Sequence, residues 1–167
     1  MSAVASTTII PTGTWIVDPA HTTVGFQVTD TADLFSTIVG RFTELEGRIE
    51  GGDEPSFAGA IRVASLHTDN EQRDAHLLSP DFLEGEKHPE IRFRSTTTEP
   101  IGDDRLRVRG ELSVKDTPFE IELEARVRGI GTGQLGDARI VLDARGSFEW
   151  GTTTVELTVA VSAAREA

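Results

Sequence analysis

Apolar and polar residues alternate along several stretches of this chain, and this alternation limits the available folds more than any other feature of the sequence. The longest examples are residues 119–128 (FEIELEARVR) and 155–161 (VELTVAV). A period of two places successive side chains on opposite faces of a strand. The polar partners are mostly Glu, Arg and Thr, as expected where one face is dry and the other is wet. The sequence therefore predicts an all-β protein built from antiparallel strands.

Turn-forming residues divide the chain into about eight predicted strands. We expect these strands near residues 21–30, 38–50, 57–65, 90–98, 104–114, 118–129, 137–149 and 153–163. Eight sequential strands joined by short turns fit a lipocalin-like, up-and-down antiparallel barrel, which is either filled by side chains or holds one slender ligand. An immunoglobulin-like sandwich is the alternative fold, although its usual Cys–Trp–Cys core is absent.

The length of 167 residues fits one domain, which we expect to span residues 14–164 after a flexible N-terminal segment at residues 1–13. The chain contains no cysteine, which excludes disulfides, zinc–thiolate sites and cysteine nucleophiles. Its first residues have neither a basic start nor a long apolar run, so we expect no secretory signal and a cytoplasmic location.

One segment, residues 65–95, interrupts the strand pattern and contains three of the four histidines. Thr68 and Glu71 have the spacing of a helix capping box, and Ser79 before Pro80 can begin a second short turn. Pro89 favours a return to extended backbone. We therefore expect one or two short helices between Asp69 and Phe82 that cover one end of the barrel.

Four short motifs follow one another in this segment: residues 68–70 (TDN), 73–77 (RDAHL), 81–83 (DFL) and 89–93 (PEIRF). In this order they resemble the motifs of the YceI-like family of lipid-binding barrels. Further matches lie outside the segment, at residues 15–26 (WIVDPAHTTVGF), 40–47 (GRFTELEG) and 108–114 (VRGELSV). The resemblance covers the chain from about Trp15 to Val161. It implies an extended, lipocalin-like barrel whose cavity holds a long isoprenoid or other acyl chain.

The histidines and a glycine-rich segment suggest other functions, which the sequence supports less well. His21, His67, His76 and His88 lack the spacing of a compact zinc site, so we expect no metal and no other cofactor. We expect His21 and His76 to bond backbone groups at the barrel mouth. Residues 131–136 (GTGQLG) match a dinucleotide-binding fingerprint, but strand-like residues follow where that fingerprint requires a helix. A loop between two barrel strands is the better interpretation.

The formal charge of −12 disfavours docking on nucleic acid or on anionic membranes, both of which require a concentrated cationic surface. We expect no nucleic-acid partner and at most a transient membrane contact, and both a monomer and a homodimer stay open. No Gly-x-Ser-x-Gly motif or separated pair of acids indicates catalysis, so we expect a protein that is not an enzyme.

We therefore expect the chain to bind a long apolar ligand, a polyisoprenoid, an isoprenoid quinone or a fatty-acyl derivative, for transport, storage or sensing. A metal-assisted hydrolase at the barrel mouth and a ligand-free interaction or stress-response module are the alternatives. The inward-facing residues of the strands, together with the helical segment, are the candidate ligand-binding residues: Phe26, Val28, Phe42, Ile61, Val63, His76, Leu77, Phe82, Phe93, Leu106, Val108, Phe119, Ile121, Leu123, Leu142, Leu157 and Val159.

Overall fold

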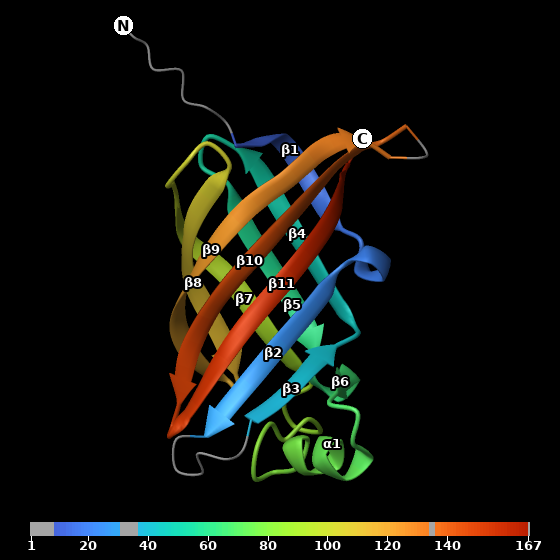
Figure 1. The fold of residues 1–167 in the computed structure, drawn as a ribbon, viewed down its shortest axis with the longest axis vertical. Coiled ribbons are helices and arrows are strands. Elements are labelled where there is room, and N and C mark those ends of the chain that lie inside the picture. Colours follow the sequence, from blue (N-terminus) through green and yellow to red (C-terminus); the bar gives the residue numbers. More distant parts are fainter. Residues whose placement is uncertain (1–8, 31–36, 134–135, 167) are drawn as a thin grey trace, which may run out of the picture.

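The computed structural model describes residues 9–30, 37–133 and 136–166, and most of them lie in long antiparallel strands (Figure 1). The strands are β1 (Ile10–Val17), β2 (Thr23–Asp30), β3 (Thr37–Phe42), β4 (Leu45–Gly52), β5 (Ser56–Arg62), β6 (Leu66–His67), β7 (Glu90–Pro100), β8 (Arg105–Val114), β9 (Thr117–Thr132), β10 (Ala138–Trp150) and β11 (Thr153–Arg165). The helical elements are the 3₁₀ turns η1 (Pro19–His21) and η2 (Val63–Ser65) and the helix α1 (Glu71–Leu77).

Among the described residues, eight strands form a closed antiparallel ring in the order β1, β4, β5, β7, β8, β9, β10 and β11. Pairing of β1 with β11, which places Trp15 opposite Arg165, closes the ring. A sandwich has no such closing pair, because its two sheets stay separate. The predicted eight-stranded barrel is thus confirmed, and the sandwich alternative is wrong.

A break between β1 and β2 lets these two strands share β11. Residues 15–17 of β1 pair with residues 163–165, whereas β2 pairs with residues 153–160. The turn η1 occupies the break, and the side chain of Asp18 caps it by accepting a hydrogen bond from Ala20 N at 3.0 Å. Beyond β2 the sheet continues through β3 to the short strand β6, which leads into the lid.

The strand boundaries differ from the prediction at three places. No strand was expected before residue 21, yet Ile10–Val17 form β1, and Ile10, in the segment expected to be flexible, is fully buried. A register shift between Ile10 and Gly13 breaks the period of two there, so alternation does not reveal this strand. The strand expected at residues 38–50 is divided into β3 and β4, and the strand expected at residues 57–65 ends at Arg62. Residues 1–8 lie outside the described part.

The predicted helix is present as α1, within the segment 68–89 that connects β6 to β7 and that we call the lid. The lid covers the end of the barrel opposite β1 (Figure 1). The helix begins one residue after Asn70, whose side chain accepts a hydrogen bond from Arg73 N at 3.0 Å. The capping box expected from Thr68 is therefore wrong, because Asn70 is the N-cap. Residues 78–84 form turns, with Phe82 N and Glu84 N both donating to Ser79 O.

The glycine-rich segment connects β9 to β10, two neighbouring antiparallel strands. Gly133 N donates to Asp137 O at 2.7 Å, and β10 begins directly afterwards at Ala138. A strand therefore follows the segment in place of a helix, and the loop interpretation is confirmed. Gln134 and Leu135 lie outside the described residues.

Candidate ligand-binding cavity

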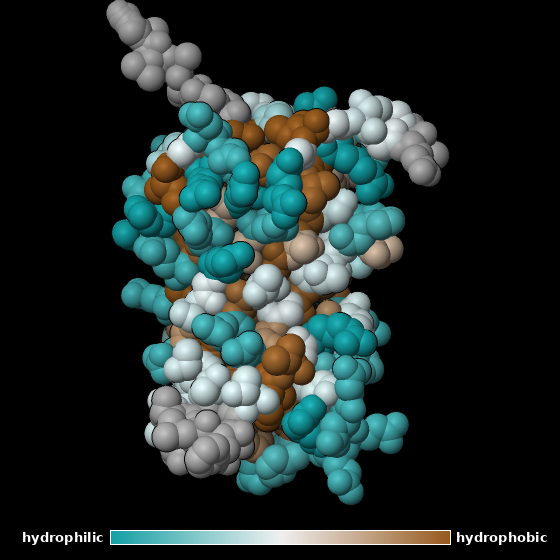
Figure 2. Space-filling view, viewed as in Figure 1, coloured by the Kyte–Doolittle hydropathy of each residue, from teal (hydrophilic) through white to brown (hydrophobic). Residues whose placement is uncertain are grey.

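The interior of the barrel holds an elongated cavity of about 960 Å³. Most of its wall is apolar, because the apolar members of each alternating strand point inward. The lining residues on the last two strands show the pattern: Leu142, Ala144, Phe148 and Trp150 on β10, and Val155, Leu157, Val159 and Val161 on β11. Charged, polar and neutral side chains cover most of the outer face in Figure 2, with apolar surface visible between them. The cavity can therefore enclose an apolar ligand within a water-exposed shell.

Most of the candidate ligand-binding residues surround this cavity. The predicted residues that line it are Phe26, Val28, Phe42, Ile61, His76, Leu77, Phe82, Phe93, Val108, Ile121, Leu123, Leu142, Leu157 and Val159. They come from strands throughout the chain and from the lid. Their inward orientation follows from the alternation, since a shift of one residue would turn each set outward.

Three candidate residues do not line the cavity, and each has a different structural reason. Val63 was expected in a strand, but β5 ends at Arg62 and Val63 lies in η2, where its Cγ1 lies close to Gly85 of the lid. Leu106 points inward but lies beyond the closed end of the cavity. Phe119 packs on Phe148 with ring centroids 5.1 Å apart, and it is Phe148 that faces the cavity.

The prediction also missed a number of lining residues, and some of them follow a visible pattern. Val24, Leu112, Ala125, Val155 and Val161 continue the same alternating faces and could have been included. Others carry no such signal: Gly47 and Gly59 face each other across β4 and β5, and their flanking residues also line the wall there. Arg73, Asp81 and Lys115 line the lid end, where polar residues predominate.

A plug of buried side chains closes the cavity at the β1 end. Trp15 and Ile140 are fully buried, and Leu106 is 2% exposed. Each is the next inward-facing residue beyond a lining residue of its own strand, namely Val17, Leu142 and Val108. Trp15 Nε1 donates to Pro11 O at 2.9 Å, so its polar atom is paired within β1. The cavity is therefore blind at this end and reaches exposed residues at the other.

Thr68, the first residue of the lid, is bonded to two side chains of α1. Its backbone N–H donates to Asp74 Oδ1 at 2.9 Å, and its hydroxyl also bonds that carboxylate. Arg73 donates to Thr68 Oγ1 at 2.9 Å and to Thr68 O at 2.6 Å. Arg73 and Asp74 thus both contact Thr68, which is 4% exposed. Much of the hydrogen-bonding capacity of the Arg73 side chain is thereby used within the lid.

The mouth of the cavity lies between the lid and the hairpins that follow β8 and β10. His76 and Phe82 line it and pack edge to face, with ring centroids 4.9 Å apart. Lys115 Nζ lies 3.4 Å from Pro80 O, so the β8–β9 hairpin contacts the lid. Phe82 is 37% exposed, whereas Leu83 is 9% exposed and belongs to the core. Phe82 is thus a partly exposed residue of the rim, and Leu83 anchors the lid.

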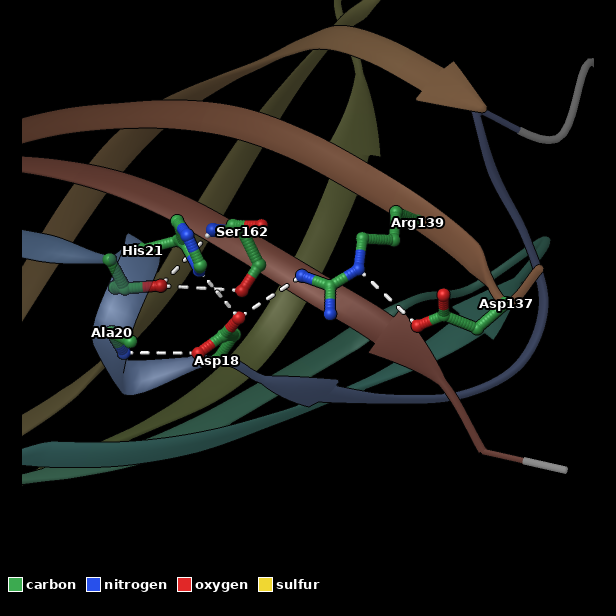
Figure 3. Close-up of polar contacts among 7 residues, drawn as sticks. Asp18, Ala20, His21, Asp137, Arg139 and Ser162 are labelled. Atoms are coloured by element: carbon green, nitrogen blue, oxygen red, sulfur yellow. Dashed lines mark hydrogen bonds and ion pairs between the residues drawn. The ribbon is translucent and has the colours of Figure 1, made fainter. Parts of the chain in front are cut away.

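A second polar cluster lies on the outside of the barrel, around η1 (Figure 3). Asp18 Oδ2 lies 2.8 Å from His21 Nδ1 and accepts a hydrogen bond from Arg139 at 3.0 Å. The bonds from His21 and Arg139 lower the pKa of the Asp18 carboxyl to about 2. His21 does not line the cavity, and its described partner is this carboxylate, so the expected backbone bond at the mouth is wrong. The cluster connects η1 to β10.

The described residues contain neither a metal-binding cluster nor a membrane-spanning helix. No group of three or more His, Cys, Asp or Glu side chains in this part of the chain could hold a metal ion. None of its helices is long and apolar enough to cross a membrane.

Comparisons with known proteins agree with the barrel and its cavity. Protein YceI of Escherichia coli O17:K52:H18 is 29% identical over 133 residues, which cover 77% of this chain and 68% of that protein. The crystal structure of Burkholderia cenocepacia BcnA superposes with a TM-score of 0.73 at 16% identity, covering 87% of this chain and 98% of the other. A polyisoprenoid binding domain from Saccharophagus degradans superposes with a TM-score of 0.70 at 14% identity, covering 91% of this chain and 98% of that domain.

The match to a family model spans nearly the whole barrel. The model that describes the YceI-like domain matches residues 15–166, from the buried Trp15 of β1 to the residue after β11. The family resemblance noted in the sequence motifs is therefore confirmed, and this chain belongs to the YceI-like domain family.

Proposed function

We propose that this protein binds one long apolar molecule inside the barrel and carries, stores or senses it without a catalytic step. The observation that supports the proposal is the blind cavity of about 960 Å³, with an apolar wall and a mouth at the lid. Burial of an aliphatic chain contributes about 0.8 kcal/mol per CH₂ before the costs of association. A chain of about 15 carbons therefore reaches micromolar affinity without specific contacts to a head group.

The similarity to a polyisoprenoid binding domain supports a polyisoprenoid or isoprenoid quinone as the ligand class. The wall is consistent with this class, because the polar and charged lining residues lie mainly at the mouth and along β4. A ligand with a polar group at one end would place that group at the mouth and its chain inside. Fatty-acyl derivatives share this chemistry and are the competing ligands.

Native mass spectrometry of the full-length protein, followed by organic extraction and identification of the extract, tests the proposal. We expect a co-purifying species with a prenyl or acyl chain, or stoichiometric uptake of an added prenol. A protein that neither contains nor takes up such a molecule would contradict the proposal. The cytoplasmic location expected from the sequence remains a prediction, which cell fractionation with the full-length chain would test.

A further inference from the structure

The cavity is wider than one extended chain requires. Its lining residues on β11 run from Thr153 to Val161, so the cavity is about 27 Å long along the strand and, at a tilt of about 40°, about 20 Å deep. An extended chain advances about 1.2 Å per atom, so about 17 chain atoms cover that depth. One carbon with its hydrogens takes up about as much space as one molecule of liquid water, about 30 Å³. The volume of about 960 Å³ therefore holds about 30 carbons. The cavity therefore holds about twice the length of chain that its depth accommodates.

Two pairs of small residues widen the cavity on opposite walls. Gly47 of β4 pairs with Gly59 of β5, and Ala125 of β9 pairs with Ala144 of β10. All four line the cavity. In the closed ring, β7 and β8 separate these two walls on one side, and β11 and β1 separate them on the other. The pairs thus lie across the barrel from each other.

Both pairs lie toward the closed end of the cavity. Ala125 pairs directly with Leu106 of the plug. Val17, the lining residue next to Trp15 of the plug, fills the space over Gly47, where a Cβ atom would lie 2.9 Å from its Cγ2. A Cβ atom at Gly59 would meet only backbone atoms within 4 Å, so Gly59 is the open member of this pair. Extra width beside a blind end is the space that a chain needs in order to turn back on itself.

Resting on the proposed function, we propose that Gly59 and Ala144 determine ligand length by letting one long chain fold back at the plug. The ligand class is a single apolar chain of about 30 carbons, from the volume estimate above. Both ends of the chain then lie near the mouth, and its middle lies between the β4–β5 and β9–β10 walls. A chain short enough to lie extended can reach the plug without needing the extra width.

Length-dependent affinity tests this role. Ala144→Leu and, separately, Gly59→Val narrow the widened end, and Ala160→Leu on β11, at a position that does not line the cavity, is the matched control. Binding of a twenty-carbon and a thirty-carbon prenol is measured by titration, with folding of each variant checked by circular dichroism. We expect both narrowing variants to bind the thirty-carbon prenol at least tenfold more weakly, with the twenty-carbon prenol and the control changed less than threefold. Equal loss for both prenols, or no loss, would overturn the proposal.

The two tryptophans of the chain give a second test of the same arrangement. Trp15 lies in the plug, and Trp150 lines the mouth. A thirty-carbon prenol brominated at its tail quenches the nearer indole, and Trp15→Phe and Trp150→Phe variants separate the two signals. We expect the tail to quench Trp150 more strongly than Trp15. Stronger quenching of Trp15 would show an extended chain and overturn the folded one, whereas failure of the wild-type protein to bind either prenol would contradict the proposed function itself.

Discussion

The aromatic ring of Phe93 on β7 lies over Gly110 of β8, where any larger residue would displace it. A Cβ atom at Gly110 would lie 2.6 Å from Cζ of Phe93 and 2.5 Å from the backbone oxygen of Arg94. Phe93 lines the cavity, so this glycine makes room for a large side chain of the wall. The same relation recurs at Gly146, where a Cβ atom would lie 2.6 Å from Cδ2 of Leu123.

Gly110→Ala is therefore expected to lower the free energy of unfolding by about 1–3 kcal/mol, the usual cost of overpacking. Gly129→Ala is the matched control, because a Cβ atom there has no neighbour within 4 Å and the position is exposed. Urea denaturation measures both variants. Equal stability of the two would contradict the packing argument.

Thr68→Val should lower the free energy of unfolding by about 1–3 kcal/mol, because it removes a buried hydroxyl that contacts both Arg73 and Asp74. The lid should also open more often, so we expect faster ligand release in a stopped-flow competition assay. Thr158→Val, at an exposed position of β11, is the control. If Thr68→Val releases ligand at the wild-type rate, Thr68 does not control the lid.

Leu83→Ala and Phe82→Ala should separate stability from ligand retention. Leu83 is buried, so Leu83→Ala should lower the free energy of unfolding by about 2–5 kcal/mol. Phe82 is partly exposed, so Phe82→Ala should lower it by less. Phe82 lines the mouth, and we expect Phe82→Ala to raise the ligand dissociation rate with only a small loss of stability. Thermal denaturation and dissociation kinetics measure the two effects. A Phe82→Ala protein with an unchanged dissociation rate would argue against a gating role.

Acid should destabilise the protein partly through Asp18. The pKa of this carboxyl is about 2 in the folded protein, below its ordinary value of 3.8. A folded-state pKa below the unfolded value stabilises the fold at higher pH, and this stability is lost as pH falls from about 4 to about 2. Asp18→Asn should weaken the pH dependence in this window, whereas Asp103→Asn in an exposed turn should not. Chemical denaturation at several pH values measures the difference, and identical profiles for wild type and Asp18→Asn would contradict it.

A neutral head group should bind at least as well as a pyrophosphate at pH 7. A phosphate site requires several converging donors, and Arg73 already donates to Thr68. Lys115 also lies at the mouth, but the carboxylate of Asp81 lies there too and offsets the positive charge of Lys115. Titration of a prenol and its pyrophosphate at low and moderate salt compares the two ligands. A pyrophosphate preference above tenfold that shrinks with added salt would reveal an anion site at the mouth.

The sequence by itself determined which side chains face inward. The period of two in residues 119–128 and 155–161 places Ile121, Leu123, Leu157 and Val159 on the cavity wall, because a strand has no other way to arrange alternate side chains. The helix between two strands was predictable from its local turn-forming residues, although its N-cap, Asn70, was not. These features depend on neighbours along the chain, and neighbours along the chain are what a sequence records.

The tertiary structure alone decided which part of the barrel is filled and which part is hollow. Leu106 and Val108 share a face of β8, yet one belongs to the plug and the other to the cavity, because Trp15 of β1 fills only one end of the barrel. The register of β1 against β4 and β11 depends on pairing between residues far apart in sequence. Alternation determines which face of a strand each residue lies on. The position of that residue along the barrel axis depends on the stagger between neighbouring strands, and whether it meets a filled or a hollow interior depends on the size of the side chains on the facing strands.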